Sequence, residues 1–176
     1  MIADDRGEPC PPGVRGTVYM RMELSDFVYK DDPAKTAAAR LGRFFTVGDI
    51  GYLDEDGFLF LCDRKADMII SGGANIYPAE IEAEIIMHPQ VADVAVFGVP
   101  DDEWGESVAA VVQPEAGVAP GPELSASILA SLEGRLARMK WPKRIDFIAE
   151  LPRDPTGKLL KRRLREPYWQ GRDTAI

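Results

Sequence analysis

Continuous hydrophobic runs mark the middle of the chain. Residues 91–99 and 107–112 are apolar over the length of a strand, and such runs indicate central strands that are covered on both faces. In residues 145–150, Ile145 and Phe147 alternate with residues of the opposite face, which is typical of a half-buried strand. These stretches predict a small β-sheet.

Other stretches repeat their hydrophobic residues at helical spacing. Leucine or isoleucine recurs at every fourth position over residues 124–136, which predicts a helix that packs on a sheet. Ile81 and Ile85 are four residues apart in 78–87, and Pro78 suits the first turn of a helix. Leucines in 159–164 predict a last helix.

The first part of the chain is predicted to be rich in strands. Residues 16–22 have the β-branched and aromatic content of a strand, and residues 31–42 carry helix formers between a proline and a glycine. Residues 44–62 hold two apolar runs around Asp-Glu-Asp-Gly at 54–57. Because Asp-Gly supplies backbone suited to a tight turn, we expect a hairpin there.

The order of these elements predicts an α+β fold. From residue 67 onward we expect a helix, two strands, a helix and a strand, then a lysine-containing loop and a last helix. This order indicates a short central sheet flanked by helices, preceded by a β-rich piece in residues 1–63.

Composition narrows the class of protein. Hydrophobic residues make up 45% and charged residues 28% of the chain, which is typical of a globular protein. A net charge of -8 argues against nucleic acid or an anionic membrane as partner. No run reaches the ~20 apolar residues of a membrane span, and Cys10 and Cys62 lack metal-type spacing, so we expect free thiols and a cytoplasmic location.

No metal site is predicted. His88 is the only histidine, and no cysteine or carboxylate cluster accompanies it, so we expect it to be a surface or capping residue. The polar run after Met1 leads us to expect that the chain is part of a longer protein.

The stretch from Asp63 to Pro78 joins a charged turn, an apolar run, the pair Gly72-Gly73 and a helix start. Glycine lets a backbone adopt positive φ and lie directly against a ligand. Alone, such a stretch is an ordinary connection between a strand and a helix. Here Thr-Val-Gly-Asp at 46–49 precedes it and Pro-Thr-Gly-Lys at 155–158 follows it.

Together these three motifs resemble the C-terminal part of the acyl-CoA synthetases, which belong to the adenylate-forming superfamily. The resemblance runs from about residue 16 to about residue 165. It implies that residues 1–63 end a large N-terminal AMP-binding domain, that 64–66 form a hinge and that 67–176 form a small mobile C-terminal domain. Lys65 and Ala66 are the predicted hinge residues; the family usually has Asp or Lys where this chain has Ala66.

The resemblance also implies roles for charged residues. Asp49 would accept hydrogen bonds from the ribose hydroxyls of ATP, and Arg64 would contact the ribose and phosphate region; from the residues alone, both could equally face water. Lys158 would be the catalytic lysine of acyl-adenylate formation, where the residues alone allow a basic surface turn. Mg²⁺ would be bound mainly by an upstream region that this chain lacks.

Coenzyme A is the expected second substrate. By resemblance, Gly72 and Gly73 would let the pantetheine arm pass, and Trp104 would lie beside it. Lys143 would meet the CoA phosphates. The alternatives are that Trp104 caps the core and that Lys143 belongs to a solvated charge run.

The predicted function is that of an AMP-forming carboxylic acid–CoA ligase, with the isolated chain inactive and the acid unspecified. Three alternatives stay open: an adenylation domain that serves a carrier protein, a luciferase-type oxygenase, and a non-catalytic nucleotide- or CoA-binding interaction module.

Overall fold

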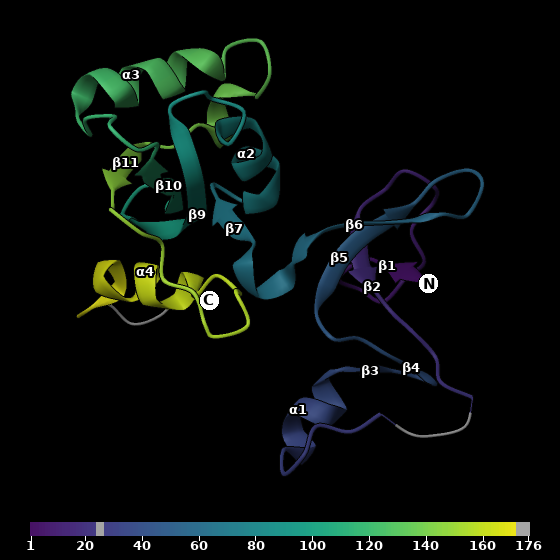
Figure 1. Ribbon diagram of the computed structural model, residues 1–176. Helices are drawn as coiled ribbons and strands as arrows, with labels where there is room; N and C mark the ends of the chain where they lie inside the picture. The colour runs from purple at the N-terminus through teal and green to yellow at the C-terminus, as the bar shows by residue number, and fades with distance from the viewer. Residues whose placement is uncertain (24–26, 172–176) are drawn as a thin grey trace. The chain divides into compact units, whose positions relative to one another are not determined.

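The computed structural model describes residues 1–23 and 27–171. The chain forms two compact units, Met1–Ala66 and Asp67–Ile176, and each is described by itself (Figure 1). The elements of the first unit are β1 (Ile2–Ala3), β2 (Gly16–Val18), α1 (Pro33–Ala38), β3 (Arg40–Leu41), β4 (Phe44–Phe45), β5 (Asp49–Leu53) and β6 (Leu59–Arg64).

The first unit is built on a four-stranded antiparallel sheet in the order β1-β2-β5-β6. The predicted hairpin is confirmed as β5 and β6. Asp54 Oδ1 accepts hydrogen bonds from the amides of Asp56 and Phe58 at 3.1 and 2.8 Å, and Gly57 has a φ of 84°. The turn therefore forms through the Asp and Gly chemistry that the sequence contains.

Two predicted elements of this unit are shorter than expected. The strand expected over 16–22 ends at Val18, because Met20 instead exchanges backbone hydrogen bonds with Phe45 at 2.8 and 2.9 Å. The helix expected over 31–42 is α1. It starts behind its N-cap Asp32, whose carboxylate accepts from the amide of Lys35, and it stops before residue 40 because β3 pairs with β4.

A short 3₁₀ turn, η1 (Lys65–Asp67), leads into the second unit. The elements of that unit are β7 (Ile69–Ser71), β8 (Ala74–Ile76), α2 (Pro78–Ile85), β9 (Val91–Asp101), β10 (Gly105–Pro114), α3 (Pro122–Ser131), η2 (Arg138–Lys140), β11 (Arg144–Phe147) and α4 (Lys161–Trp169).

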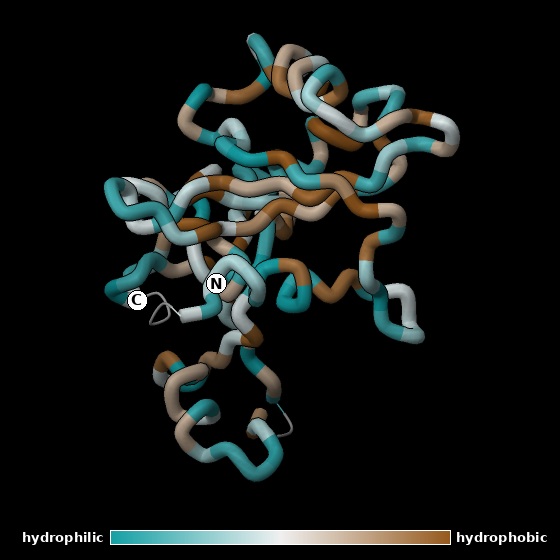
Figure 2. Tube along the Cα trace, turned by 90° about the vertical axis from the view of Figure 1, so that its left-hand side faces the viewer, coloured by the Kyte–Doolittle hydropathy of each residue, from teal (hydrophilic) through white to brown (hydrophobic). Residues whose placement is uncertain are grey.

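The strand β10 is the centre of a five-stranded sheet. It pairs with β9 along its whole length in antiparallel register, runs parallel to β11, and meets β7 at Gly105 and Ser71. The hydrophobic colouring of Figure 2 runs through the middle of this unit. The α+β fold and the paired central strands predicted from the sequence are confirmed.

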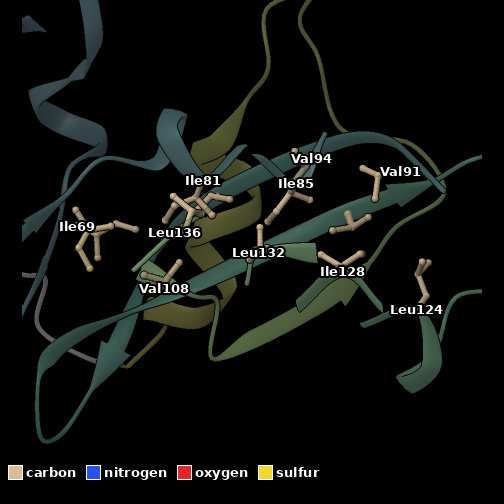
Figure 3. Packing of buried hydrophobic residues seen from close by; sticks show 14 residues of the cluster. Ile69, Ile81, Ile85, Val91, Val94, Val108, Leu124, Ile128, Leu132 and Leu136 are labelled. Atoms are coloured by element: carbon tan, nitrogen blue, oxygen red, sulfur yellow. The ribbon is translucent and has the colours of Figure 1, made fainter. Parts of the chain in front are cut away.

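The side chains of β9 and β10 alternate between two hydrophobic clusters. Val94, Val96 and Val108 belong to a cluster with residues of α2 and α3, part of which Figure 3 shows at close range. Phe97 and Val111 belong to a second cluster that α4 covers. In Figure 1, α2 and α3 lie on one side of the sheet and α4 on the other, so these strands are buried on both faces.

The predicted order of this unit omits β7 and β8, which precede α2, and the strand expected over 145–150 ends at Phe147. Two further expectations need correction. The helix expected over 124–136 ends at Ser131; turns follow, with Gly134 at a φ of 74°, and they still bring Leu132 and Leu136 into the core. His88 is buried, with 7% exposure, so it is not a surface residue. Its Nε2 lies 2.9 Å from Ser127 Oγ, and its Nδ1 accepts a hydrogen bond from the Gln90 amide. Because Gln90 follows α2, this bond is of the kind that a capping residue makes.

Over residues 1–23 and 27–171, no helix combines the length and the hydrophobicity needed to cross a membrane.

Candidate functional site

The β5–β6 hairpin places the two predicted nucleotide-binding side chains opposite each other. Asp49 begins β5, Arg64 ends β6, and the two residues are cross-strand partners. Arg64 Nε lies 3.8 Å from Asp49 Oδ1, and the side chains are 59% and 28% exposed. An exposed pair of this kind adds at most about 1 kcal/mol to stability. Both groups therefore stay available to a polar ligand.

The loop that carries Lys158 is organised around the carboxylate of Asp154. Its Oδ1 accepts hydrogen bonds from the Thr156 amide, the Thr156 hydroxyl and the Lys158 amide at 2.8, 2.6 and 3.0 Å. These hydrogen bonds hold the pKa of Asp154 below its usual range, and the bond from the Thr156 hydroxyl has the largest effect. Gly157 completes the turn with a φ of 87°.

Lys158 is exposed at the end of this loop. In the part of the chain that the structure describes, its Nζ makes no hydrogen bond or ion pair. The loop therefore fixes the backbone of Lys158 and leaves its ammonium exposed.

The turn between β7 and β8 consists of Gly72 and Gly73, with φ values of 56° and 80°. The Gly72 amide donates to the Trp104 carbonyl at 2.8 Å. A Cβ on Gly72 would lie 2.4 Å from Trp104 Cε3, whereas a Cβ on Gly73 would meet nothing within 4 Å. Trp104 is 47% exposed; its ring covers Gly72 and does not cap the core.

Asp101 holds the neighbouring groups in place. Its Oδ1 accepts from the amides of Glu103 and Trp104, both at 3.1 Å, and its Oδ2 lies 3.0 Å from Lys143 Nζ. The hydrogen bond from Lys143, followed by that from the Trp104 amide, lowers the pKa of Asp101 to about 2. Lys143 Nζ also lies 5.7 Å from the centre of the Trp104 ring, so one carboxylate orders both the indole and the ammonium.

The predicted hinge residues lie in η1, beside the boundary between the two units. Lys65 Nζ pairs with Asp5 Oδ1 at 2.9 Å, and the Lys65 amide donates to the Gly48 carbonyl at 2.7 Å. Ala66 is exposed. The backbone before the boundary is thus tied to the first unit.

The structure brings the predicted site residues into two groups. Asp49 and Arg64 form the first, and Gly72, Trp104 and Lys143 form the second. Gly73 adjoins the second group but contacts Trp104 through none of the described interactions. Lys158 has no hydrogen bond or ion pair to either group within the described residues.

Sequence reasoning missed the residues that hold these groups in place. Asp154 and Asp101 precede short turns, and an aspartate two residues before a turn amide is a recognisable sequence signal. Glu106 gives a weaker signal. It is an acid at the start of an apolar run, yet it is buried and accepts hydrogen bonds from the Ile70 amide and from Arg165, both at 3.1 Å.

Comparison with known proteins finds a family model that matches part of the second unit. Residues 80–158 match the model of the AMP-binding enzyme C-terminal domain. This range contains the Trp104 loop and Lys143 and ends at Lys158.

Relatives match over most of this chain. It is 43% identical over 159 residues to a 2-succinylbenzoate–CoA ligase of Geobacillus kaustophilus, covering 90% of this chain and 32% of that enzyme. It is 40% identical over 168 residues to the fatty acid–acyl-carrier-protein ligase ScoC of Streptomyces coeruleorubidus, covering 96% of this chain and 32% of that one.

A solved structure of ATP-bound MatB from Rhodopseudomonas palustris matches with a TM-score of 0.86 and 37% identity, covering 96% of this chain and 33% of that one. The chain thus spans about a third of the length of these relatives.

Proposed function

Residues 80–158 match the AMP-binding enzyme C-terminal domain, and the chain is similar to adenylate-forming enzymes over most of its length. We propose that it belongs to this family and acts as the C-terminal portion of an ATP-dependent carboxylic acid–CoA ligase. In the first half-reaction a substrate carboxylate attacks the α-phosphate of ATP and releases pyrophosphate. In the second, the CoA thiol attacks the acyl carbonyl and AMP leaves.

The single observation that carries this proposal is the exposed ammonium of Lys158 on a loop whose backbone is fixed by Asp154. The first half-reaction brings two anions together. A lysine offers a mobile point charge with three donors, and fixed charge of this kind commonly supplies a large catalytic term. Lys158 would stabilise the carboxylate and the α-phosphate as they approach.

Asp49 and Arg64 suit the nucleotide. A carboxylate offers acceptors and no donor, as two ribose hydroxyls require, and a guanidinium can make paired contacts to ribose and phosphate oxygens. Mg²⁺ would bind the triphosphate, held mainly by the upstream part of the ligase. The carboxylic acid would be chosen there too, so its identity stays open.

Gly72, Gly73, Trp104 and Lys143 suit the thiol substrate. Gly73 is a bare backbone position with open space above it, where a thin pantetheine arm could pass. The indole of Trp104 offers an apolar face beside it. Phosphates of CoA would compete with Asp101 for the ammonium of Lys143, which is now paired at 3.0 Å.

A carrier-protein thiol is the second candidate acceptor, because ScoC, 40% identical to this chain, is named for such an acceptor. CoA and a carrier protein present the same pantetheine thiol but differ in the phosphates beyond it. Lys143→Ala should therefore raise the KM for CoA several-fold if CoA is the acceptor.

We place the hinge of the ligase at Lys65 and Ala66, beside the boundary of the two compact units. Turning the second unit about this point between the half-reactions would withdraw Lys158 and bring the glycine turn into its place. The partners of the chain would be ATP, a carboxylic acid, CoA and its own N-terminal domain, in the cytoplasm.

The test uses a hybrid ligase in which this chain replaces the matching C-terminal part of the Geobacillus kaustophilus enzyme, assayed with 2-succinylbenzoate. We expect Lys158→Ala to lower pyrophosphate release at least about 100-fold, the scale of a lost preorganised charge. Conversion of supplied acyl-adenylate to the thioester should continue.

The control is Lys30→Ala, which removes another exposed lysine and should leave both half-reactions unchanged. Equal pyrophosphate release by the Lys158→Ala hybrid and the unmodified hybrid would favour the non-catalytic binding module instead. The chain by itself should release no pyrophosphate, because it contains no Gly-rich loop for the ATP phosphates.

A further inference from the structure

The loop around Lys158 is closed by its own backbone. The Asp154 amide donates to the Lys158 carbonyl at 2.9 Å, and the Leu160 amide donates to the Pro152 carbonyl at 2.8 Å. Arg153 and Leu159 form an isolated β-bridge between the two sides. These bonds give the loop its shape, but they do not attach it to the sheet.

The loop is attached to the sheet by the packing of Leu151 and Leu159 in the second hydrophobic cluster and by two polar links. The Leu151 amide donates to Gln113 Oε1 on β10 at 3.0 Å. Two residues later, Arg153 Nη2 pairs with Asp93 Oδ2 on β9. Asp93 and Gln113 are themselves cross-strand partners, so both polar links end on a single residue pair of the β9–β10 hairpin.

The guanidinium of Arg153 makes a second contact within the loop. Its Nη1 donates to the Gly157 carbonyl at 2.7 Å, and this carbonyl belongs to the peptide group that joins Gly157 to Lys158. A single side chain therefore connects the sheet to the backbone immediately before Lys158.

We propose that Arg153 is a positioning residue that sets where the Lys158 ammonium lies during acyl-adenylate formation, by tying the Gly157 carbonyl to Asp93. This inference rests on the function proposed above. It assigns no contact between Arg153 and the substrates.

Only a guanidinium fits both tasks. Its two terminal nitrogens point in fixed directions and reach two different acceptors at once, whereas a lysine ammonium is a compact charge on a flexible stem. The ion pair is 45% exposed on the arginine side and 27% on the aspartate side, so its loss should cost about 1 kcal/mol or less in stability. Variants of Arg153 should fold.

Position matters far more to the reaction than to folding. A displacement of about 1 Å in a catalytic group can cost about 100-fold in rate. We expect Arg153→Ala, in the hybrid ligase, to lower kcat for pyrophosphate release about 10- to 100-fold, with KM for ATP changed less than about twofold. Thioester formation from supplied acyl-adenylate should stay at the unmodified rate, because that step does not use Lys158.

Further variants separate positioning from charge. Arg153→Lys keeps the charge and should lose nearly as much activity as Arg153→Ala. Asp93→Asn should show a smaller loss, and Asp93→Asn combined with Arg153→Ala should be no slower than Arg153→Ala alone.

Guanidinium chloride at about 20 mM should partly restore the activity of Arg153→Ala but not that of Lys158→Ala, as expected when a missing guanidinium fragment is replaced. Arg163→Ala, which removes an exposed arginine of α4, is the matched control and should leave both half-reactions intact.

A second measurement on the 176-residue chain needs no activity. In Arg153→Ala, the NMR amide signals of Gly157 and Lys158 should shift and their hydrogen exchange should accelerate several-fold, while the amides of the β9–β10 hairpin keep their protection. The same signals should stay unchanged in Arg163→Ala.

The outcomes distinguish the two proposals. Arg153→Lys with full activity, or an equal loss of both half-reactions in Arg153→Ala, would overturn the positioning role. If Lys158→Ala releases pyrophosphate at the unmodified rate, the proposed function fails first, whatever the amide signals show. If Lys158→Ala is inactive while Arg153→Ala is fully active, the positioning role alone is wrong.

Discussion

At the scale of single residues, the neighbouring glycines Gly72 and Gly73 are required for different physical reasons. Both have positive φ, which costs an L-residue with a side chain roughly 1–2 kcal/mol. Only Gly72 also lacks room, because its missing Cβ would overlap the ring of Trp104. The two glycines look equivalent in the sequence, but in the structure only Gly72 lies directly against the indole of Trp104.

This difference predicts unequal effects of alanine. Gly73→Ala should destabilise the chain by about 1 kcal/mol, from backbone strain alone. Gly72→Ala should cost about 2–4 kcal/mol, because the strain is joined by an overlap of the kind that overpacking produces, unless Trp104 moves away. Urea unfolding of the two variants measures the difference.

If Trp104 moves instead, its fluorescence emission should shift to longer wavelength in Gly72→Ala and stay unchanged in Gly73→Ala. Equal unfolding free energies combined with identical emission spectra would contradict the contact between Gly72 and Trp104.

At the scale of elements, the last helix depends on its attachments. The helix α4 has nine residues with a proline inside and no side-chain N-cap, so it is too short to be stable alone. Lys161 pairs with Glu82 at 2.7 Å, and Arg165 pairs with Glu106 at 3.1 Å. The Trp169 indole donates to the Gly98 carbonyl at 3.1 Å. These contacts fix the helix that directly follows the Lys158 loop.

A further hydrogen bond ties α4 to β11. The Tyr168 hydroxyl donates to Asp146 Oδ2, which also accepts from Arg144 Nε at 2.6 Å. Burial, followed by this hydrogen bond, raises the pKa of Tyr168 to about 12. The hydroxyl therefore keeps its proton, and this contact, throughout the neutral range.

Glu106 joins Arg165 of α4 to the Ile70 amide, and Gly98 leaves room for its carboxylate. A Cβ on Gly98 would lie 2.5 Å from Glu106 Oε2. Gly98→Ala should therefore push the carboxylate away from the Ile70 amide and from Arg165 and destabilise the chain by about 2–4 kcal/mol, because it disrupts a buried charged hydrogen-bond pair. Urea unfolding followed by circular dichroism measures this loss.

Gly121→Ala is the matched control, since that glycine also has extended backbone and no atom within 4 Å of its added Cβ. Because Gly121 is the N-cap of α3, alanine there should cost about 0.5–1 kcal/mol, which is less than the loss expected for Gly98→Ala. A Gly98→Ala variant as stable as Gly121→Ala would show that Glu106 relaxes at no cost.

At the scale of the whole molecule, the first unit exposes an apolar surface on its edge strand. Phe58, Leu59, Phe60 and Leu61 are 68%, 48%, 45% and 63% exposed, and β6 is the last strand of its sheet. Side chains of successive strand residues point to opposite faces, so apolar groups are exposed on both faces of this edge, and exposed apolar surface of this kind marks an interaction site. In the proposed ligase, of whose relatives the chain spans about a third, we expect the rest of the N-terminal domain to cover this surface.

This surface predicts how the 176-residue chain behaves alone. It should bind the dye ANS and self-associate at micromolar concentration, and Leu61→Lys should reduce both by several-fold, because a charge breaks the apolar strip. Dye fluorescence and light scattering measure the change. Met87→Lys is the control, since Met87 is a similarly exposed apolar residue, at 69%, in the second unit. An equal reduction by both variants would contradict a specific role for β6.

The sequence alone determined the type and order of most elements, since these depend on neighbours along the chain. The apolar runs in 91–99 and 107–112 predict buried strands whatever their pairing partners are. The Asp and Gly residues of 54–57 form their turn through local hydrogen bonds. The motifs around Asp49, Gly72 and Lys158 likewise indicated the family, because their residue types and their order along the chain can be read directly from the sequence. Hinge motion and the roles of these residues stay predictions.

Only the tertiary structure decided which side chains meet. Sheet register places Arg64 opposite Asp49, the β9–β10 turn brings Trp104 onto Gly72, and Asp93 reaches Arg153 from a strand 60 residues away. The burial of His88 was equally invisible in the sequence. Such contacts follow from how strands and helices pack over long sequence separations, and hydrophobic spacing specifies that an element has a buried face without specifying what covers it.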